Sequence, residues 1–335
     1  MRIPFDELKA TFEEILKSRG IKEETARISA ENFASSSADG VYTHGVNRFP
    51  KVISYLERGL INGNGEPECV FSMGAVERWD GHMGLGNVNA KKAMDRACGL
   101  ASLHGIAMVA LKNTSHWMRG GAYGWQAAER GFIGLCWTNS MPNMPPWGGT
   151  DPRLGNNPLV IAVPSPDGNH AVIDMAMSQF SYGKIELARL KGETLPVPGG
   201  WNKGGALTCD PKEIEESRLV LPMGYWKGSG LSVLLDIAAA VLSGGRTVKE
   251  IGEAFGEDAG VSQIFIAMKP EPEALKAVTR VLEDVKASAP REGGSVFYPG
   301  EIEKNTRKEN MERGIPVLDT VWETIQALKK GGSHG

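Results

Sequence analysis

The sequence has few cysteines and none of the short spacings that would pair them or bind a metal. Four cysteines occur in 335 residues, and no CxxC is present. So few unpatterned thiols are typical of a reducing compartment and leave no role for disulfides. The formal net charge of −3 lacks the basic excess of a nucleic-acid-binding protein. We therefore predict a cytoplasmic protein that does not bind nucleic acid.

Long hydrophobic runs are also missing. The most apolar stretch, residues 231–245, is too short to cross a bilayer and contains Asp236. Acidic side chains interrupt the first 20 residues, whose apolar positions recur at helical spacing, so this segment does not have the pattern of a signal peptide. These features predict a soluble chain without a membrane partner.

Three motifs of nucleotide or metal chemistry are absent: GxGxxG after a strand, a Walker A loop and HExxH. GHMGLGN (81–87) places its glycines as GxxGxG, and the start of the helix behind it suits a phosphate. A simple turn that caps this helix is the more economical explanation. The six histidines include no i, i+4 pair, so the sequence predicts no metal site.

Helical periodicity at both ends encloses a middle rich in glycine, proline and short apolar runs, without regular βαβ alternation. This predicts an α/β chain made of one interwoven unit. Its approximate regions are 1–119 (helical, with the substrate residues), 120–270 (strand-rich, with the cofactor) and 271–335 (helical, packing back). The terminal GGSHG is left without predicted structure. Predicted helices are 4–36 in two parts divided at 18–20, one following Pro50, 87–104, 231–243 (buried), 271–288, 301–313 and 319–330; predicted strands are 106–113, 132–139, 158–165, 170–177 and 262–270.

GVYTHGVNRFP (40–50) contains the first candidate site. His44 and Arg48 are four residues apart and would share a face if the segment is helical. An imidazole exchanges protons near neutral pH, and a guanidinium binds a carboxylate through two hydrogen bonds. The pair fits proton transfer next to a carboxylate, although a capping histidine and a solvated arginine explain the spacing as well.

Three further segments carry polar side chains beside apolar runs. His116 and Arg119 follow a predicted strand, where site loops are common, although a purely structural loop is as plausible. Asp174 lies within an apolar strand and needs a partner if it is buried, or else reaches solvent. Lys227 precedes three small residues at a helix start, which suits a phosphate or a plain helix cap.

Taken together, THGVNR, NTSHWMRGG, VIDMAMS, LPMGYWKGSG and the late PGE resemble the malate/L-lactate dehydrogenase family, over residues 1–328 and in the family's order. The resemblance implies a non-Rossmann fold with a largely antiparallel sheet in the cofactor region. It also implies an NAD(P)-dependent 2-oxoacid reductase, with NADH preferred over NADPH, that forms a homodimer. The segment PGEIE departs from the family's PGHE-like pattern, so only its glycine and backbone contacts carry over.

Site residues are assigned by the same resemblance. His44 matches the family's proton donor, with Arg48, His116 and Asp174 as further catalytic candidates. Arg48 would fix the substrate carboxylate and Asp174 would orient His44. Candidate substrate contacts are Thr43, Arg48, His116 and Arg119. Candidate cofactor contacts are His170, Ala171, Val172, Ile173, Asp174, Met175, Ala176, Trp226, Lys227, Gly300, Glu301 and Ile302.

The substrate class follows less directly. Trp117 and Arg119 favour a longer, polyhydroxylated sugar acid, because an indole and a second cation suit such a chain. Other 2-oxoacids remain alternatives: malate, lactate, sulfolactate, ureidoglycolate or a cyclic imino acid. A non-catalytic sugar-acid binding protein and, more remotely, a metal-dependent hydrolase complete the set.

Overall fold

A seven-stranded mixed sheet organises the chain in the computed structural model, which describes residues 1–331; residues 332–335, including His334 and most of the terminal GGSHG, lie outside the described part. The strand order is β2-β3-β4-β11-β5-β6-β7, and only β3 and β4 run parallel. This confirms the largely antiparallel sheet. The strands are β2 (Glu68–Met73), β3 (Val76–Gly84), β4 (Ile106–Ser115), β5 (Ile133–Thr138), β6 (Leu159–Val163), β7 (Ala171–Met175) and β11 (Ala259–Met268).

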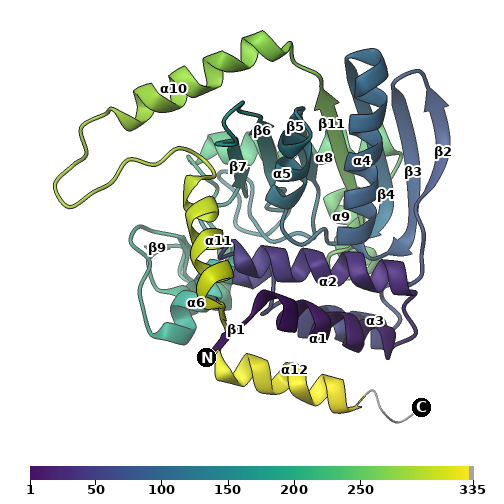
Figure 1. Ribbon diagram of the computed structural model, residues 1–335. Coiled ribbons are helices and arrows are strands. Elements are labelled where there is room, and N and C mark those ends of the chain that lie inside the picture. Colours follow the sequence, from purple (N-terminus) through teal and green to yellow (C-terminus); the bar gives the residue numbers. More distant parts are fainter. Residues whose placement is uncertain (332–335) are drawn as a thin grey trace.

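Helices cover both faces of this sheet (Figure 1). On one face α4 (Gly86–His104) packs on β4 and β11, and α5 (Gly121–Glu129) packs on β5 to β7. On the other face α8 (Trp226–Ser243) packs on β4, β5 and β11, with α9 (Val248–Ala254) beside it. Small side chains such as Ala93 and Ala97 let α4 approach the sheet closely, so its core side is fully buried.

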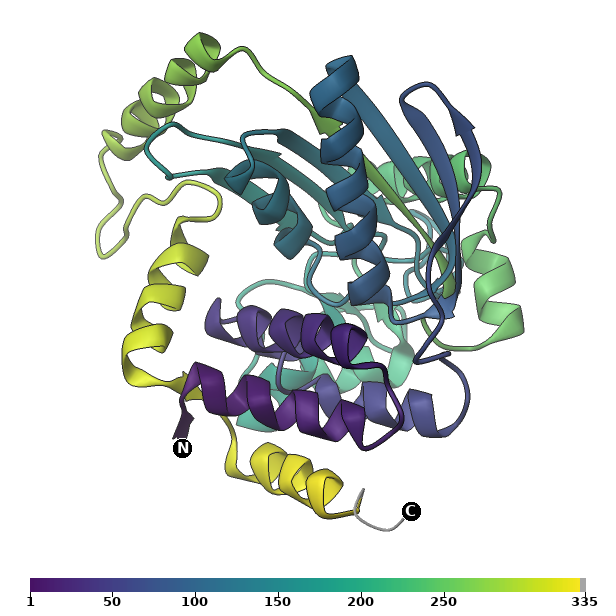
Figure 2. The ribbon, with the colours of Figure 1, turned by 45° about the vertical axis from the view of Figure 1, so that its right-hand side comes forward.

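The two chain ends form a second, helical layer below the sheet (Figures 1 and 2). It consists of α1 (Phe5–Lys17), α2 (Glu23–Ala38), α3 (Phe49–Glu57) and α12 (Asp319–Gly331). Phe12, Phe33 and Phe49 meet in its core with ring centroids 4.1–6.0 Å apart. A two-stranded pairing of β1 (Arg2–Ile3) with β12 (Ile315–Pro316) fastens the ends together. The predicted division of the first helical segment near Gly20 and the helix start at Pro50 are both confirmed.

Several elements were not predicted because glycines or charges hide their periodicity. They are the β2–β3 hairpin, α5, η1 (Tyr42–His44), α6 (Tyr182–Lys191), α7 (Pro211–Ser217), α9, η2 (Pro272–Leu275) and a small sheet of β8 (Gly200–Trp201), β9 (Leu207–Thr208) and β10 (Leu219–Val220). The predicted helix 271–288 is η2 followed by α10 (Lys276–Lys286), which extends away from the body (Figure 1). The helix predicted at 301–313 is α11 (Glu301–Arg313).

The prediction that 231–243 is a buried helix is wrong. This helix begins five residues earlier, at Trp226, and only its inner side is buried; Leu234, Ile237 and Val241 are more than half exposed. With 18 residues and a mean hydropathy of 1.2, it is also long and apolar enough to cross a membrane, contrary to the estimate from sequence. Core helices of soluble proteins can have the same length and hydropathy, and the inner side of this helix packs on β4, β5 and β11.

Candidate active site

The His44 segment leaves α2 through a tight connection. His44 ends η1, and Arg48 lies directly before α3, so the two residues do not share one helix as the spacing suggested. Gly45 separates them, and a Cβ there would lie 2.2 Å from Oγ of Ser37. That oxygen accepts a hydrogen bond from the backbone N–H of Val46. Close packing on α2 therefore places His44 and Arg48 near each other without a helical face.

His116 joins this pair from the end of β4. Its ring stacks on that of His44, with centroids 5.5 Å apart and planes inclined by 13°. Nδ1 of His116 accepts a hydrogen bond from the backbone N–H of Met118 at 2.9 Å. A neutral His116 therefore carries its proton on Nε2, where it can be donated to a ligand. The structure thus brings together His44, Arg48 and His116, three residues selected from sequence.

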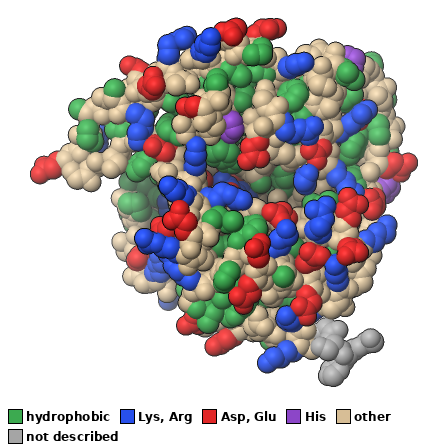
Figure 3. Space-filling model, in the orientation of Figure 1, with side chains coloured by type: hydrophobic (Ala, Val, Ile, Leu, Met, Phe, Trp, Pro, Cys, Tyr) green, Lys and Arg blue, Asp and Glu red, His purple; other side chains and the backbone are tan. Residues whose placement is uncertain are grey.

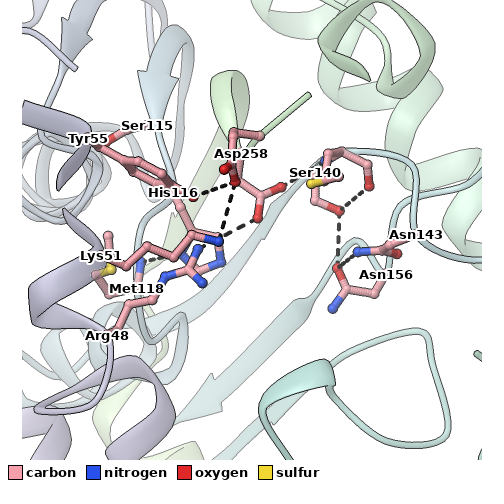
Figure 4. A network of polar contacts seen from close by, with 12 residues as sticks. Arg48, Lys51, Tyr55, Ser115, His116, Met118, Ser140, Asn143, Asn156 and Asp258 are labelled. Atoms are coloured by element: carbon pink, nitrogen blue, oxygen red, sulfur yellow. Dashed lines mark hydrogen bonds and ion pairs between the residues drawn. The ribbon is translucent and has the colours of Figure 1, made fainter. Parts of the chain in front are cut away.

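Asp258 completes the cluster and was not found from sequence. It lies just before β11 in a charged turn, GEDAG, which carries no motif. Its Oδ1 accepts from the N–H of Met141 at 2.8 Å, and its Oδ2 lies 3.9 Å from Nη2 of Arg48. Its carbonyl accepts from the N–H of His116 at 3.0 Å (Figure 4). Asp258 therefore links three segments of the site.

The histidines are uncharged at neutral pH in this arrangement. Desolvation by the surrounding protein, followed by the nearby His116 and Arg48, lowers the pKa of His44 to about 3, while Asp258 opposes this effect. Desolvation, Arg48 and Lys51 lower the pKa of His116 to about 3. Nε of Arg48 is buried without a hydrogen-bond partner among the described residues. The cluster therefore offers a cation and two neutral imidazoles, a setting that favours an anionic ligand.

Asp174 has a different partner from the one predicted. As a residue it is exposed on the edge strand β7, the solvent-reaching alternative left open by the sequence, while its carboxylate packs against Gly121. Its Oδ2 accepts a hydrogen bond from the N–H of Gly121 at 2.7 Å. Surrounding protein atoms raise its pKa, against that bond and the charge of Arg119. Within residues 1–331 no hydrogen bond joins Asp174 to His44, and the carboxylate that acts on His44 is that of Asp258.

Arg119 is buried, and its guanidinium pairs with Asp39, which also pairs with Arg307 at 2.9 Å. Its predicted contact with the substrate would compete with this pairing. Thr43 packs against Gly183 of α6, where an added Cβ would lie 2.7 Å from Cβ of Thr43, and its hydroxyl lies 3.3 Å from Nδ1 of His44. Arg48 is therefore the better placed cation for a ligand beside His44.

A cavity of about 520 Å³ opens between α2, α5 and α11. Figure 3 shows this face hollowed, with Lys and Arg side chains at the margin. His170, one of the predicted cofactor residues, lines it together with Trp125, and their ring centroids are 5.9 Å apart. Cations from two elements line it as well: Lys91 of α4, and Lys304 and Arg307 of α11. Aromatic rings that can contact a base, with cations nearby that can contact phosphates, are typical of a nucleotide-binding site.

The other predicted cofactor segments lie along β7. Gly300, at the start of α11, adopts φ +96°, and an added Cβ would lie 3.2 Å from the nitrogen of Val172. At the other end of β7, the N–H of Met223 donates to the carbonyl of Met177, which places the start of α8, Trp226 and Lys227, beside that end. The side chain of Glu301 pairs with Lys286 at 2.8 Å. The three segments therefore follow one edge strand.

The model of the family described as malate/L-lactate dehydrogenase matches residues 3–326. The chain belongs to the malate/L-lactate dehydrogenase family. A curated relative from Escherichia coli O127:H6, named 2,3-diketo-L-gulonate reductase, is 48% identical over 334 residues, which are 98% of this chain and 100% of the relative. Family membership, predicted from five motifs, is confirmed.

Solved structures of malate/L-lactate dehydrogenase type agree with the fold. Sulfolactate dehydrogenase from Methanocaldococcus jannaschii has a TM-score of 0.91 at 31% identity and covers 99% of this chain and 97% of its own. Malate dehydrogenase from Entamoeba histolytica has a TM-score of 0.94 at 27% identity, with 100% and 99% covered. The non-Rossmann fold class implied by the motifs is therefore confirmed.

Proposed function

We propose that this protein reduces the C2 carbonyl of 2,3-diketo-L-gulonate to 3-dehydro-L-gulonate with NADH. The observation that carries the proposal is the cluster of His44, Arg48 and His116, in a chain 48% identical over its length to a relative named for this reaction. The substrate has a carboxylate next to a carbonyl. Arg48 can bind the carboxylate, and the neighbouring imidazole can give a proton to the carbonyl oxygen.

Each residue has a distinct task. Arg48 binds the C1 carboxylate, and the Asp258 carboxylate on its other side keeps the guanidinium in position. His116 donates from Nε2 to a substrate oxygen, since its Nδ1 is held by Met118. A bound nicotinamide supplies the hydride to C2. His44 takes up a proton when the substrate carboxylate lies beside Arg48, and it gives this proton to the oxygen that gains negative charge at C2, as a general acid.

The residues around β7 fit such a cofactor. Trp125 and His170 offer ring faces for a base, and Lys91, Lys304 and Arg307 offer charges for phosphates. The cavity also contains acidic side chains, among them Glu129. A carboxylate hydrogen-bonds a ribose 2′-hydroxyl and repels a 2′-phosphate, which favours NADH over NADPH. Comparing kcat/KM for the two cofactors tests this preference.

We further propose that the protein works as a homodimer in the cytoplasm. Leu234, Ile237 and Val241 form an exposed apolar face on α8, and α10 has no buried residue. Apolar faces of this kind are typical of subunit interfaces. A second copy of the chain would cover them by symmetry. Light scattering on the purified protein measures the mass directly.

The reaction is tested by NADH oxidation against a panel of 2,3-diketo-L-gulonate, pyruvate, oxaloacetate and oxalurate. The proposal expects the highest kcat/KM for the sugar acid. Faster turnover of a short 2-oxoacid would favour the malate or lactate alternative, and no oxidation with any of them would favour a binding protein.

A further inference from the structure

A group of polar side chains faces the catalytic cluster from the loop between β5 and β6. Ser140, Asn143 and Asn156 form it, and Oδ1 of Asn156 accepts hydrogen bonds from Oγ of Ser140 at 3.1 Å and from Nδ2 of Asn143 at 3.3 Å. Figure 4 shows Asn143 and Asn156 on one side, Arg48 and His116 on the other, and Asp258 between them.

Two bridges join this group to the catalytic cluster. On one side Asp258 accepts from the N–H of Met141, the neighbour of Ser140, and lies 3.9 Å from Arg48. On the other side the hydroxyl of Tyr182 donates to the carbonyl of Asn143 at 3.1 Å, and the next residue of α6 packs against Thr43. The loop is therefore held against the residues that flank both Arg48 and His44.

The group has unused hydrogen-bonding capacity. Oδ1 of Asn143 is buried without a partner among the described residues. Nδ2 of Asn156 donates to no group in the described part of the chain, because both bonds of this side chain use Oδ1. An unpaired buried acceptor costs about 1–3 kcal/mol, so a ligand that satisfies it gains affinity. One acceptor and one donor remain for a ligand.

We infer that Asn143 and Asn156 bind the hydroxyl-bearing tail of the substrate and select polyhydroxylated 2-oxoacids. A hydroxyl donates to Oδ1 of Asn143 and a second hydroxyl accepts from Nδ2 of Asn156, as the chain beyond C3 of a sugar acid allows. A second carboxylate or a sulfonate is rejected, because it has no proton for Oδ1 of Asn143. The inference rests on the proposed function for the position of C1 and C2.

Equilibrium binding separates this role from catalysis. L-gulonate and L-lactate share a carboxylate and a C2 hydroxyl, but only L-gulonate has further hydroxyls. Calorimetric titration of the NADH-loaded protein, which cannot oxidise either hydroxy acid, should show tighter binding of L-gulonate. Asn143→Ala and Asn156→Ala should each raise the Kd of L-gulonate about three- to tenfold, the effect of one neutral hydrogen bond, and leave that of L-lactate unchanged.

A third asparagine serves as the control for these two variants. Asn305→Ala makes the same change at an exposed position of α11 and should alter neither Kd. If an alanine variant fails to fold, Asn156→Ser keeps an acceptor for Ser140 and Asn143 and should still lose affinity for L-gulonate alone. Equal losses for both ligands, or none for either, would overturn the inference. Absent turnover with intact selectivity would overturn only the proposed reaction.

Discussion

Binding of a carboxylate at Arg48 should draw a proton onto His44. In the free protein desolvation, His116 and Arg48 hold the pKa of His44 at about 3. A carboxylate beside Arg48 offsets the repulsion from this cation and adds a negative charge near the imidazole. An opposite charge within about 4–6 Å favours the charged imidazole and raises its pKa by about 1–3, so the pKa of His44 is higher in the complex than in the free protein.

Linkage fixes the sign and the size of the effect. Because the complex holds the proton more tightly than the free protein, affinity for the ligand rises as the pH falls from the pKa of the complex toward about 3. The gain is tenfold per pH unit in that window, and about 10- to 1000-fold in total. Above the window the affinity is constant.

The assay is a pyruvate titration of the NAD-loaded protein at a series of pH values from 7 down to the limit of folding. His44→Asn is the matched control, because it keeps Arg48 and a polar side chain but cannot gain the proton. Its affinity should stay flat where that of the wild type rises. A wild-type profile that is flat, or one that His44→Asn reproduces, would refute the coupling between Arg48 and His44.

Three further outcomes follow from the same structure. Asp258→Asn removes the charge 3.9 Å from Arg48, so the KM for pyruvate should rise. Asp258→Glu keeps a carboxylate and should show a smaller rise in KM. Equal KM values in wild type and both variants would contradict the role of the carboxylate. Gly86→Ala would place a Cβ 2.0 Å from the carbonyl oxygen of Ser115, and urea unfolding should show a loss of about 3 kcal/mol; an unchanged midpoint would mean that the backbone relaxes freely. Ile237→Lys puts a charge in the exposed face of α8 and should halve the mass in light scattering, whereas an unchanged dimer would place the interface elsewhere.

Local patterns in the sequence predicted the elements whose limits and buried side depend on nearby residues alone. Phe12, Ile15 and Leu16 recur at helical spacing and are fully buried in α1, and Pro50 occupies the first turn of α3. The burial of α8 was mispredicted, because its apolar residues surround the helix and periodicity does not show which side meets the sheet.

Only part of the candidate active site could be predicted from the sequence. His44, Arg48 and His116 lie in distinctive motifs, and the structure places them together. Asp258 was missed because its role depends on β11 lying between β4 and β5, a long-range pairing that one charged turn does not encode. Asp174 was proposed to orient His44 after the family resemblance was recognised, but its hydrogen-bond partner is the N–H of Gly121.

The central claim is that His44 supplies the proton in an NADH-dependent reduction of 2,3-diketo-L-gulonate. The direct measurement is kcat for this substrate in wild type and in His44→Asn, at saturating NADH. We expect the variant to bind NADH normally and to lose about 10²- to 10⁴-fold in kcat, the usual contribution of a general acid. A variant that turns over at the wild-type rate would contradict the account.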